Sequence, residues 1–356
     1  MRYRLLGNSA LRVSEVALGT MTFGERWGWG AELAESRRML DLFLDRGGNF
    51  VDTANNYTDG ESEEQLGELL EGRRERVVLA TKYTLTSRPD DPNAGGNHRK
   101  NLVQTLESSL RRLRTDRVDL LWMHMWDGIT PIDEVVRALD DVVAAGKVIA
   151  VGISDTPAWV VSRAVAIAEL RGWTRPSAIQ LPYSLASRDP ERELFPMAAY
   201  LGLAVLAWGN LGGGVLTGKY EESGGAPRRY GDHTPGERLA RVAELVREIA
   251  AASDATPSQV CIAWVLAQRG KANLIPLLGA RSAAQLEENL GALVLELAPE
   301  ALERLEAATA IPLGFPSTFL ADDEVVHLIF GDTRALIETR RSGSTRPGEL
   351  FRGDPS

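Results

Sequence analysis

Four side chains with acid–base chemistry stand at the ends of three apolar runs or just beyond them. Asp52 ends the run FVD, Tyr57 follows five residues later, Lys82 ends VVLATK, and His124 ends VDLLWMH. A phenol with an unperturbed pKa near ~10 is a weak proton donor at neutral pH, and a nearby ammonium lowers that pKa. A carboxylate can hold the ammonium, and an imidazole can orient or polarise a carbonyl oxygen. Together these residues predict a site that protonates a carbonyl oxygen as it becomes an alcohol.

Each of the four residues also has a purely structural interpretation. An Asp–Lys pair at strand ends is often structural, a single tyrosine on a loop usually lies at the surface, and a single histidine is usually a satisfied core residue. The order Asp52, Tyr57, Lys82 and His124 along successive strand ends favours the catalytic interpretation.

The elements that must position these residues repeat along the chain. Eight short runs rich in Val, Leu and Ile show little alternation, as is typical of parallel strands covered on both faces. These runs are residues 15–20, 49–54, 77–82, 118–124, 148–154, 177–181, 203–208 and 273–279. Helical patterns follow them. Eight strand–helix units predict an α/β fold, a (β/α)8 TIM barrel, with a doubly wound sheet as the structural alternative.

Residues outside the repeat extend the predicted barrel. The first 13 residues, with GNS at their centre, predict a β-hairpin before the first barrel strand. Segments 83–100 and 209–236 are longer than the repeat needs, and long loops after strands lie on the catalytic face of a barrel. We therefore expect a single barrel domain over residues 1–339 and a mobile tail over 340–356.

Several helix starts carry capping signals. Ser62 with Gln65 predicts a capping box, and so does Ser282 with Gln285. Thr156–Pro157 and Thr256–Pro257 each predict an N-cap followed by proline at the first helical position.

Composition excludes several classes of protein. The 356 residues carry a net charge of −9 and a pI of about 5.2, which argues against non-specific binding to nucleic acid or anionic membranes. The single cysteine, Cys261, precludes an intrachain disulfide and favours a reducing compartment; its place in an apolar run indicates a buried, inert thiol. No apolar stretch resembles a signal peptide or a membrane span, so we expect a cytoplasmic protein. No spacing of His or Cys indicates a metal site.

The motifs in their order resemble those of the aldo-keto reductases over roughly residues 3 to 310. DTANNY, ATKY and DLLWMH carry the four chemical residues, and GISD, QLPYSL, LTGKY and GARSAAQLEENLGA continue the match. The resemblance implies a barrel enzyme that transfers hydride between a nicotinamide cofactor, usually NADP(H), and a carbonyl or alcohol. It also implies that Tyr57 is the general acid, that Lys82 and Asp52 tune it, and that His124 orients the substrate.

The resemblance extends to residues that would hold the cofactor. Ser154 and Gln180 match residues that hold the nicotinamide carboxamide, whereas Asp155 stands where the family has asparagine; an ionised aspartate can only accept hydrogen bonds. Trp208 occupies the position of the ring that stacks on nicotinamide. Arg281, at a predicted helix N-terminus, suits the 2′-phosphate and favours NADPH over NADH. The other expected cofactor contacts are Thr20, Met21, Asp52, Gly209, Asn210, Leu211, Gly212, Lys219, Gly279, Gln285, Glu288 and Asn289.

Three tryptophans suggest the kind of substrate. Trp27 and Trp29 follow the first barrel strand and Trp126 follows His124, so flat apolar side chains could wall the pocket for a carbonyl compound with an aromatic or extended apolar body. They could instead only close the barrel mouth.

Two functions other than a reductase remain open at this point. One is a weakly catalytic, nicotinamide-binding redox-sensing subunit on the same barrel, and the other is an unrelated barrel lyase or isomerase. The run GGVLTGK imitates a phosphate-binding NTPase loop, but Tyr220 stands where that motif needs Ser or Thr, so we reject that interpretation.

Overall fold

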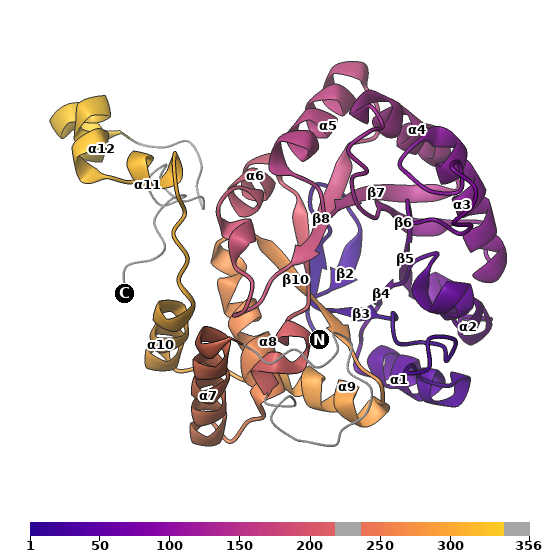
Figure 1. The fold of residues 1–356 in the computed structure, drawn as a ribbon, viewed down its shortest axis with the longest axis horizontal. Coiled ribbons are helices and arrows are strands. Elements are labelled where there is room, and N and C mark those ends of the chain that lie inside the picture. The colour runs from indigo at the N-terminus through magenta and orange to yellow at the C-terminus, as the bar shows by residue number, and fades with distance from the viewer. Residues whose placement is uncertain (218–235, 338–356) are drawn as a thin grey trace.

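Eight parallel strands close into a barrel at the centre of the computed structural model, which describes residues 1–217 and 236–337 (Figure 1). Around the barrel the strand order is β10-β3-β4-β5-β6-β7-β8-β9. The strands are β3 (Ala17–Gly19), β4 (Phe50–Asp52), β5 (Val78–Tyr83), β6 (Val118–Met123), β7 (Val148–Ser154), β8 (Pro176–Pro182), β9 (Ala204–Trp208) and β10 (Asn273–Gly279). All eight predicted strands are confirmed, and the closure of β10 onto β3 excludes the doubly wound sheet.

Helices surround the barrel and connect its strands (Figure 1). They are α1 (Leu33–Asp45), α2 (Glu61–Leu69), α3 (Arg99–Arg112), α4 (Ile132–Ala144), α5 (Ala158–Arg171), α6 (Leu194–Leu201), α7 (Glu237–Ala252), α8 (Pro257–Ala267), α9 (Ala283–Leu290) and α10 (Pro299–Thr309). Cys261 lies in α8, which confirms the expectation of a buried thiol, and burial raises its pKa to about 12.

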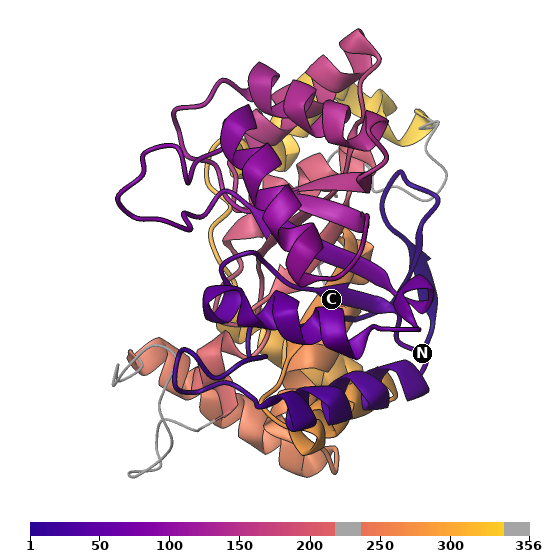
Figure 2. The same cartoon turned by 90° about the vertical axis from the view of Figure 1, so that its right-hand side faces the viewer.

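A two-stranded hairpin, β1 (Tyr3–Leu5) and β2 (Arg12–Ser14), closes the N-terminal end of the barrel. Leu6 and Val13 belong to the same buried cluster as the side chains that fill the barrel interior. Gly7 has a φ of 58°, and a Cβ there would lie 1.9 Å from the Ser177 carbonyl oxygen, so only glycine permits this close approach. Figure 2 shows the hairpin and the long loop between β5 and α3 at opposite ends of the barrel. The predicted hairpin is confirmed, and the opposite end remains available for chemistry.

Two of the four predicted helix starts are wrong. Helix α2 begins after Gly60, so Ser62 lies inside the helix, and its hydroxyl donates to the Thr20 carbonyl oxygen. In α5 the N-cap is Pro157 rather than Thr156, whose hydroxyl donates to the Ser154 carbonyl oxygen. In both cases a tertiary or loop partner binds the hydroxyl that the sequence pattern assigns to a cap.

The other two predicted N-caps are present. Thr256 caps α8, with Gln259 completing a capping box. Ser282 caps α9 by accepting from the Gln285 backbone N–H, although the Gln285 side chain accepts from the Arg281 N–H instead of completing the box.

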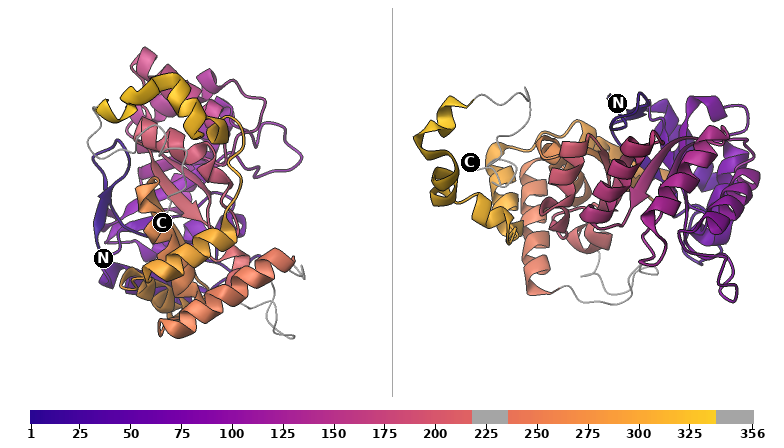
Figure 3. Two further views of the ribbon diagram at one scale, coloured as in Figure 1. Left: turned by 90° about the vertical axis from the view of Figure 1, so that its left-hand side faces the viewer. Right: turned by 90° about the horizontal axis from the view of Figure 1, so that it is seen from above.

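Beyond α10 the chain forms an arm beside the barrel, with α11 (Ser317–Leu320) and α12 (Asp323–Phe330) (Figure 3). Phe315 and Leu328 on this arm are more than four-fifths exposed. The expected tail over 340–356 lies outside the described residues. Among the residues described, no helix combines the length and apolar character that crossing a membrane requires.

Candidate active site

The ammonium of Lys82 is the centre of the polar cluster at the C-terminal end of the barrel. It donates to Asp52 Oδ2 at 2.5 Å, to the Thr53 carbonyl oxygen at 2.7 Å and to the Tyr57 hydroxyl at 3.1 Å. Parallel pairing of β4 with β5 brings Asp52 and Lys82 together at the ends of adjacent strands. Because the lysine has three donors and all three are used, its Nζ atom is fixed between the carboxylate and the phenol.

Charge pairing keeps Lys82 protonated in this buried site. Both the Asp52 and the Lys82 side chains are fully buried. Burial raises the pKa of Asp52. Burial alone would lower the pKa of Lys82, but the negative charges of Asp52 and of an ionised Tyr57 outweigh it and raise that pKa above its ordinary value. Lys82 therefore stays an ammonium at physiological pH.

Asp52 has two further partners inside the barrel. Trp122 Nε1 donates to Asp52 Oδ1 at 2.8 Å, and Gln180 Nε2 donates to the same oxygen at 3.2 Å. Three donors thus satisfy a carboxylate that would be costly to bury unpaired.

A strained turn brings Tyr57 back over the barrel mouth. Thr58 and Asp59 have φ values of 46° and 54°, a region that non-glycine residues seldom adopt, and Gly60 follows at 90°. The Thr58 hydroxyl donates to the Phe23 carbonyl oxygen at 2.6 Å and accepts from the Ser62 N–H at 3.1 Å. These contacts hold the turn, and strain of this kind is concentrated at functional sites.

His124 completes the set of predicted catalytic residues. Its ring lies edge-on to the Tyr57 ring, with centroids 6.1 Å apart. Burial, together with the positive charge of Lys82, lowers the pKa of His124 to about 3, so the imidazole is neutral at physiological pH. Its Nδ1 atom is buried and has no hydrogen-bond partner among the described residues. A neutral imidazole can orient a carbonyl oxygen through its remaining N–H, but that N–H is too weakly acidic to serve as the proton donor.

The three predicted substrate tryptophans lie in two separate places. Trp27 and Trp29 pack against each other with ring centroids 5.7 Å apart, and Trp27 Nε1 donates to Asp59 Oδ1 at 3.2 Å. Trp126 packs edge-on against Trp159 at 5.4 Å. The first pair is thereby tied to the Tyr57 turn, whereas Trp126 lies two residues beyond His124.

The residues expected to hold the nicotinamide end of the cofactor lie in or just after β7, β8 and β9. The Ser154 hydroxyl is buried beside the Asp155 carboxyl group, whose pKa it helps to lower. Asp155 adopts a φ of 42° and accepts from Trp208 Nε1 at 3.3 Å. Gln180, expected to hold the carboxamide, binds Asp52 here. A buried hydroxyl and a half-buried indole are suited to an amide-bearing aromatic ligand.

Asp155 has an unusual protonation equilibrium. Although its side chain retains accessible surface at the barrel mouth, the surrounding barrel limits its hydration and raises its pKa to about 6, against the opposing effects of the Trp208 N–H and the Lys82 charge. Its carboxyl group therefore changes from neutral to charged near that pH.

Other expected cofactor contacts follow β3 and β9. Thr20 is buried and donates to the Asp52 carbonyl oxygen at 3.1 Å, and Met21 follows it. Gly209 has open space where a Cβ would stand. Asn210 is buried and donates to the carbonyl oxygens of Tyr183 and Ala207, so its amide shapes the loop. Lys219 lies outside the described residues.

Arg281 is exposed at the start of α9, next to the N-cap Ser282. The side chains of Gln285 and Glu288 already have partners: Gln285 accepts from the Arg281 N–H, and Glu288 accepts from the Thr256 hydroxyl. Asn289 donates to the Gly279 carbonyl oxygen at 3.4 Å. The Arg281 side chain therefore lies beside the N-terminus of α9, and this arrangement suits a phosphate group.

A cavity of about 290 Å3 opens beside Asp155 and Gln180. Its lining is mostly apolar and comes from β7, β8, α5 and α6, with Asp155 and Gln180 at its polar edge. Because neither Tyr57 nor His124 lines it, we do not assign it as the place where a carbonyl would react.

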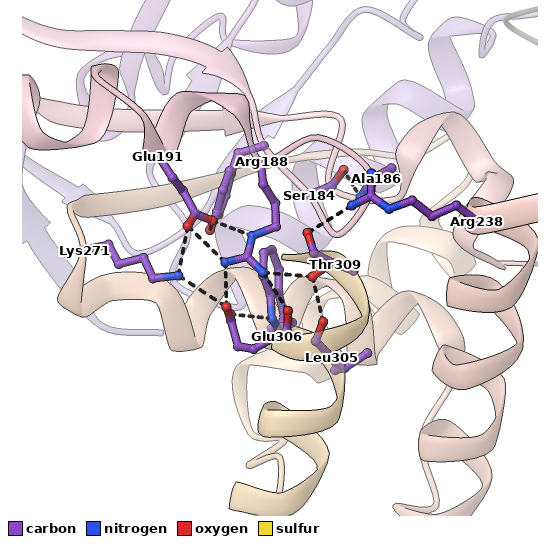
Figure 4. A network of polar contacts seen from close by, with 11 residues as sticks. Ser184, Ala186, Arg188, Glu191, Arg238, Lys271, Leu305, Glu306 and Thr309 are labelled. Carbon is purple, nitrogen blue, oxygen red and sulfur yellow. Dashed lines mark hydrogen bonds and ion pairs between the residues drawn. The ribbon is translucent and has the colours of Figure 1, made fainter. Parts of the chain in front are cut away.

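A network of polar contacts supports the loop after β8 from outside the barrel (Figure 4). The Arg188 guanidinium donates to Glu191 of this loop and to Glu306 and Thr309 of α10. Lys271 also pairs with Glu191 and Glu306. This network fixes the loop between Gln180 and α6 to helix α10.

Two contacts of this site were absent from the sequence-based prediction. One is the bond from Trp122 to Asp52; Trp122 stands two residues before His124, and side chains two apart in an extended chain lie on the same side. Thr84, which accepts from the His124 backbone N–H at 3.2 Å, was also missed. Within the described ranges, no group of three His, Cys, Asp or Glu side chains could hold a metal.

Comparison with known proteins agrees with this geometry. The model of the Aldo/keto reductase family matches residues 15–310. The chain is 38% identical to norsolorinic acid reductase of Aspergillus flavus over 89% of its length and 84% of that protein. It is 35% identical to a putative aryl-alcohol dehydrogenase of Saccharomyces cerevisiae over 91% of each chain. It is 34% identical to aryl-alcohol dehydrogenase [NADP(+)] of Phanerodontia chrysosporium over 93% of its length and 89% of that protein. The chain therefore belongs to the aldo/keto reductase family of oxidoreductases.

Proposed function

We propose that this protein uses NADPH to reduce an aldehyde or ketone with an aromatic body to the alcohol, with Tyr57 as the general acid. The observation that carries the proposal is the position of Lys82 Nζ, within hydrogen-bond distance of both Asp52 and the Tyr57 hydroxyl. The relatives named aryl-alcohol dehydrogenase support the choice of an aromatic substrate class.

The proposed chemistry assigns one task to each side chain. NADPH supplies the hydride when it is bound. The Tyr57 hydroxyl donates its proton to the carbonyl oxygen, and the Lys82 ammonium at 3.1 Å stabilises the phenolate that remains. Asp52 keeps that ammonium in place. His124, neutral because of its burial, orients the carbonyl oxygen by hydrogen bonding and takes no part as an acid.

The cofactor assignment rests on the donor set at the strand ends. Ser154 offers a buried hydroxyl, Trp208 offers a ring face, and Arg281 offers a positive charge beside the α9 N-terminus. A cation near a helix N-terminus favours the additional 2′-phosphate of NADPH over NADH.

Titration of NADPH and NADH into the purified protein, followed by addition of a nitrobenzaldehyde, tests the proposal. We expect tighter binding of NADPH and its oxidation by the aldehyde. Binding without oxidation would instead support a redox-sensing subunit, and the absence of binding would refute the cofactor assignment.

The charge of Asp155 should make the cofactor preference depend on pH. Above its pKa of about 6, the carboxylate favours the cationic ring of NADP+ over the neutral ring of NADPH. The ratio of the NADP+ Kd to the NADPH Kd should therefore fall by about three- to ten-fold as pH rises from about 5 to 8. In Asp155→Asn that ratio should stay constant. The 2′-phosphate titrates in the same range, but it is common to both cofactors and cancels in the ratio. A ratio that does not change with pH in the unmodified protein would contradict this role.

Replacing Trp126 with Ala should affect aromatic substrates selectively. Loss of a flat apolar wall should raise the KM for an aromatic aldehyde by about ten-fold or more, and the KM for a small aliphatic aldehyde much less. Steady-state kinetics with both aldehydes measure the difference. An equal change in both KM values would show that Trp126 only closes the barrel mouth.

A further inference from the structure

The loop that carries His124 and Trp126 is attached to a neighbouring loop through one buried amide. Asn97, in the loop between β5 and α3, is fully buried. Its Nδ2 atom donates to the Met125 carbonyl oxygen and to the Thr84 hydroxyl, each at 2.9 Å. Its Oδ1 atom accepts from the Asp127 N–H at 2.7 Å. Both donors and the acceptor of this side chain are therefore used.

These hydrogen bonds hold the backbone immediately before and immediately after Trp126. The Met125 carbonyl and the Asp127 N–H belong to the residues just before and just after Trp126, so Asn97 fixes the backbone on each side of the indole. Asp127 returns the contact, because its Oδ2 atom accepts from the Asn97 N–H at 2.8 Å. Asp127 Oδ1 also accepts from the Ile129 and Thr130 N–H groups, which holds the rest of the loop.

Thr84 connects the same amide to His124. Its hydroxyl accepts from the His124 N–H at 3.2 Å as well as from Asn97. Thr84 has a φ of 109°, where a β-branched side chain is strongly disfavoured. Strain of this kind persists only where surrounding contacts impose it, and it is typical of functional sites. Here it places the threonine hydroxyl directly after β5, two residues beyond Lys82.

We propose that Asn97 and Thr84 are positioning residues that set His124 and Trp126 for large aromatic carbonyl substrates. The inference rests on the proposed function, because it assumes that Trp126 contacts the substrate. Neither residue is among the expected cofactor contacts, and neither touches the Lys82 ammonium. Their loss should therefore change substrate selectivity and leave cofactor affinity unaltered.

The first test compares Asn97→Ala with Asn93→Ala, an exposed asparagine of the same loop. Kinetics with a bulky aromatic aldehyde and a small aliphatic aldehyde are measured, together with the NADPH Kd and Tm. A displacement of about 1 Å can lower turnover by roughly 10²-fold. For Asn97→Ala we expect a lower kcat with both aldehydes. The KM should rise only for the bulky aldehyde, and the NADPH Kd should be unchanged. Asn93→Ala should match the unmodified protein.

The outcomes separate this inference from the proposed function. Suppose that the unmodified protein oxidises NADPH and that Asn97→Ala is folded. If this variant keeps the same ratio of the two KM values, the positioning role is wrong and the proposed function stands. If the unmodified protein does not turn over either aldehyde, the proposed function fails first. A purely structural role would lower Tm and leave the ratio unchanged.

A second pair of variants applies if Asn97→Ala does not fold. Thr84→Val removes the hydroxyl that His124 and Asn97 share and keeps the side-chain shape, whereas Thr84→Ser keeps the hydroxyl. The valine variant should show the selective rise in KM, and the serine variant should restore most of the normal ratio. Equal ratios in the two variants would overturn the proposal.

Discussion

Tyr57→Phe should lower the kcat for aldehyde reduction by about 10²- to 10⁴-fold, the usual contribution of a positioned general acid. The substitution removes only the hydroxyl to which the Lys82 ammonium donates at 3.1 Å, and with it the proposed general acid. The NADPH Kd should be nearly unchanged, because the phenol does not hold the dinucleotide. Steady-state kinetics and a binding titration measure both quantities.

Tyr3→Phe provides a matched control for this variant. Tyr3 lies in the N-terminal hairpin, where its hydroxyl donates to the Gly47 carbonyl oxygen at 2.8 Å, far from the catalytic end of the barrel. Its kcat should equal that of the unmodified protein. Weak NADPH binding by Tyr57→Phe would contradict the assigned role, and so would substantial residual turnover.

Lys82→Met should reduce both stability and turnover. Removing one partner of a fully buried ion pair typically lowers the free energy of unfolding by about 3–5 kcal/mol. The Asp52 carboxyl, whose pKa burial already raises, would then have to stay protonated in the folded protein. Because the folded state would hold a proton that the unfolded chain releases above its ordinary pKa, the stability of this variant should fall as pH rises. Denaturant unfolding at several pH values measures the effect.

The double variant Lys82→Met with Asp52→Asn separates stability from catalysis. A neutral amide can still accept from Trp122 Nε1, one of the partners that Asp52 has in the barrel, and carries no charge that needs a counterion. The free energy of unfolding should therefore recover most of the loss, whereas turnover should stay low because no ammonium supports Tyr57. Recovery of turnover in the double variant would show that Lys82 has no catalytic role.

The barrel could be predicted from the sequence because each parallel strand is buried on both faces and appears as an apolar run. Asp52 and Lys82 could be predicted as site residues because they stand at the ends of those runs. Their contact at 2.5 Å follows from the pairing of β4 with β5. The register of parallel strands places their C-terminal residues at one end. These parts of the site depend on local pattern and topology, both of which the sequence carries.

The turn at Tyr57 could not be predicted in the same way. Thr58 and Asp59 adopt positive φ values. A β-branched threonine rarely does so, and it does so here because the Thr58 hydroxyl binds the distant Phe23 carbonyl oxygen. As a result α2 begins after Gly60, and the capping box assigned to Ser62 is absent. A tertiary contact overrides the local signal here.

The side-chain contacts that form across the barrel could not be predicted from the sequence either. Trp122 and Gln180 both donate to Asp52 Oδ1, and these contacts depend on the size of the closed barrel rather than on spacing in the chain. Asn97 lies 27 residues before His124 in the sequence, and nothing in its loop identifies it as a partner of Trp126. Such contacts appear only when three-dimensional packing is known.

Transfer of label from NADPH to an aromatic aldehyde would test hydride transfer most directly. Purified protein is mixed with NADPH that carries deuterium at C4 of the nicotinamide ring, on the transferring face, and with a nitrobenzaldehyde. The proposed function predicts a nitrobenzyl alcohol with one deuterium on the former carbonyl carbon. Formation of unlabelled alcohol, or no alcohol from protein that binds NADPH tightly, would contradict it.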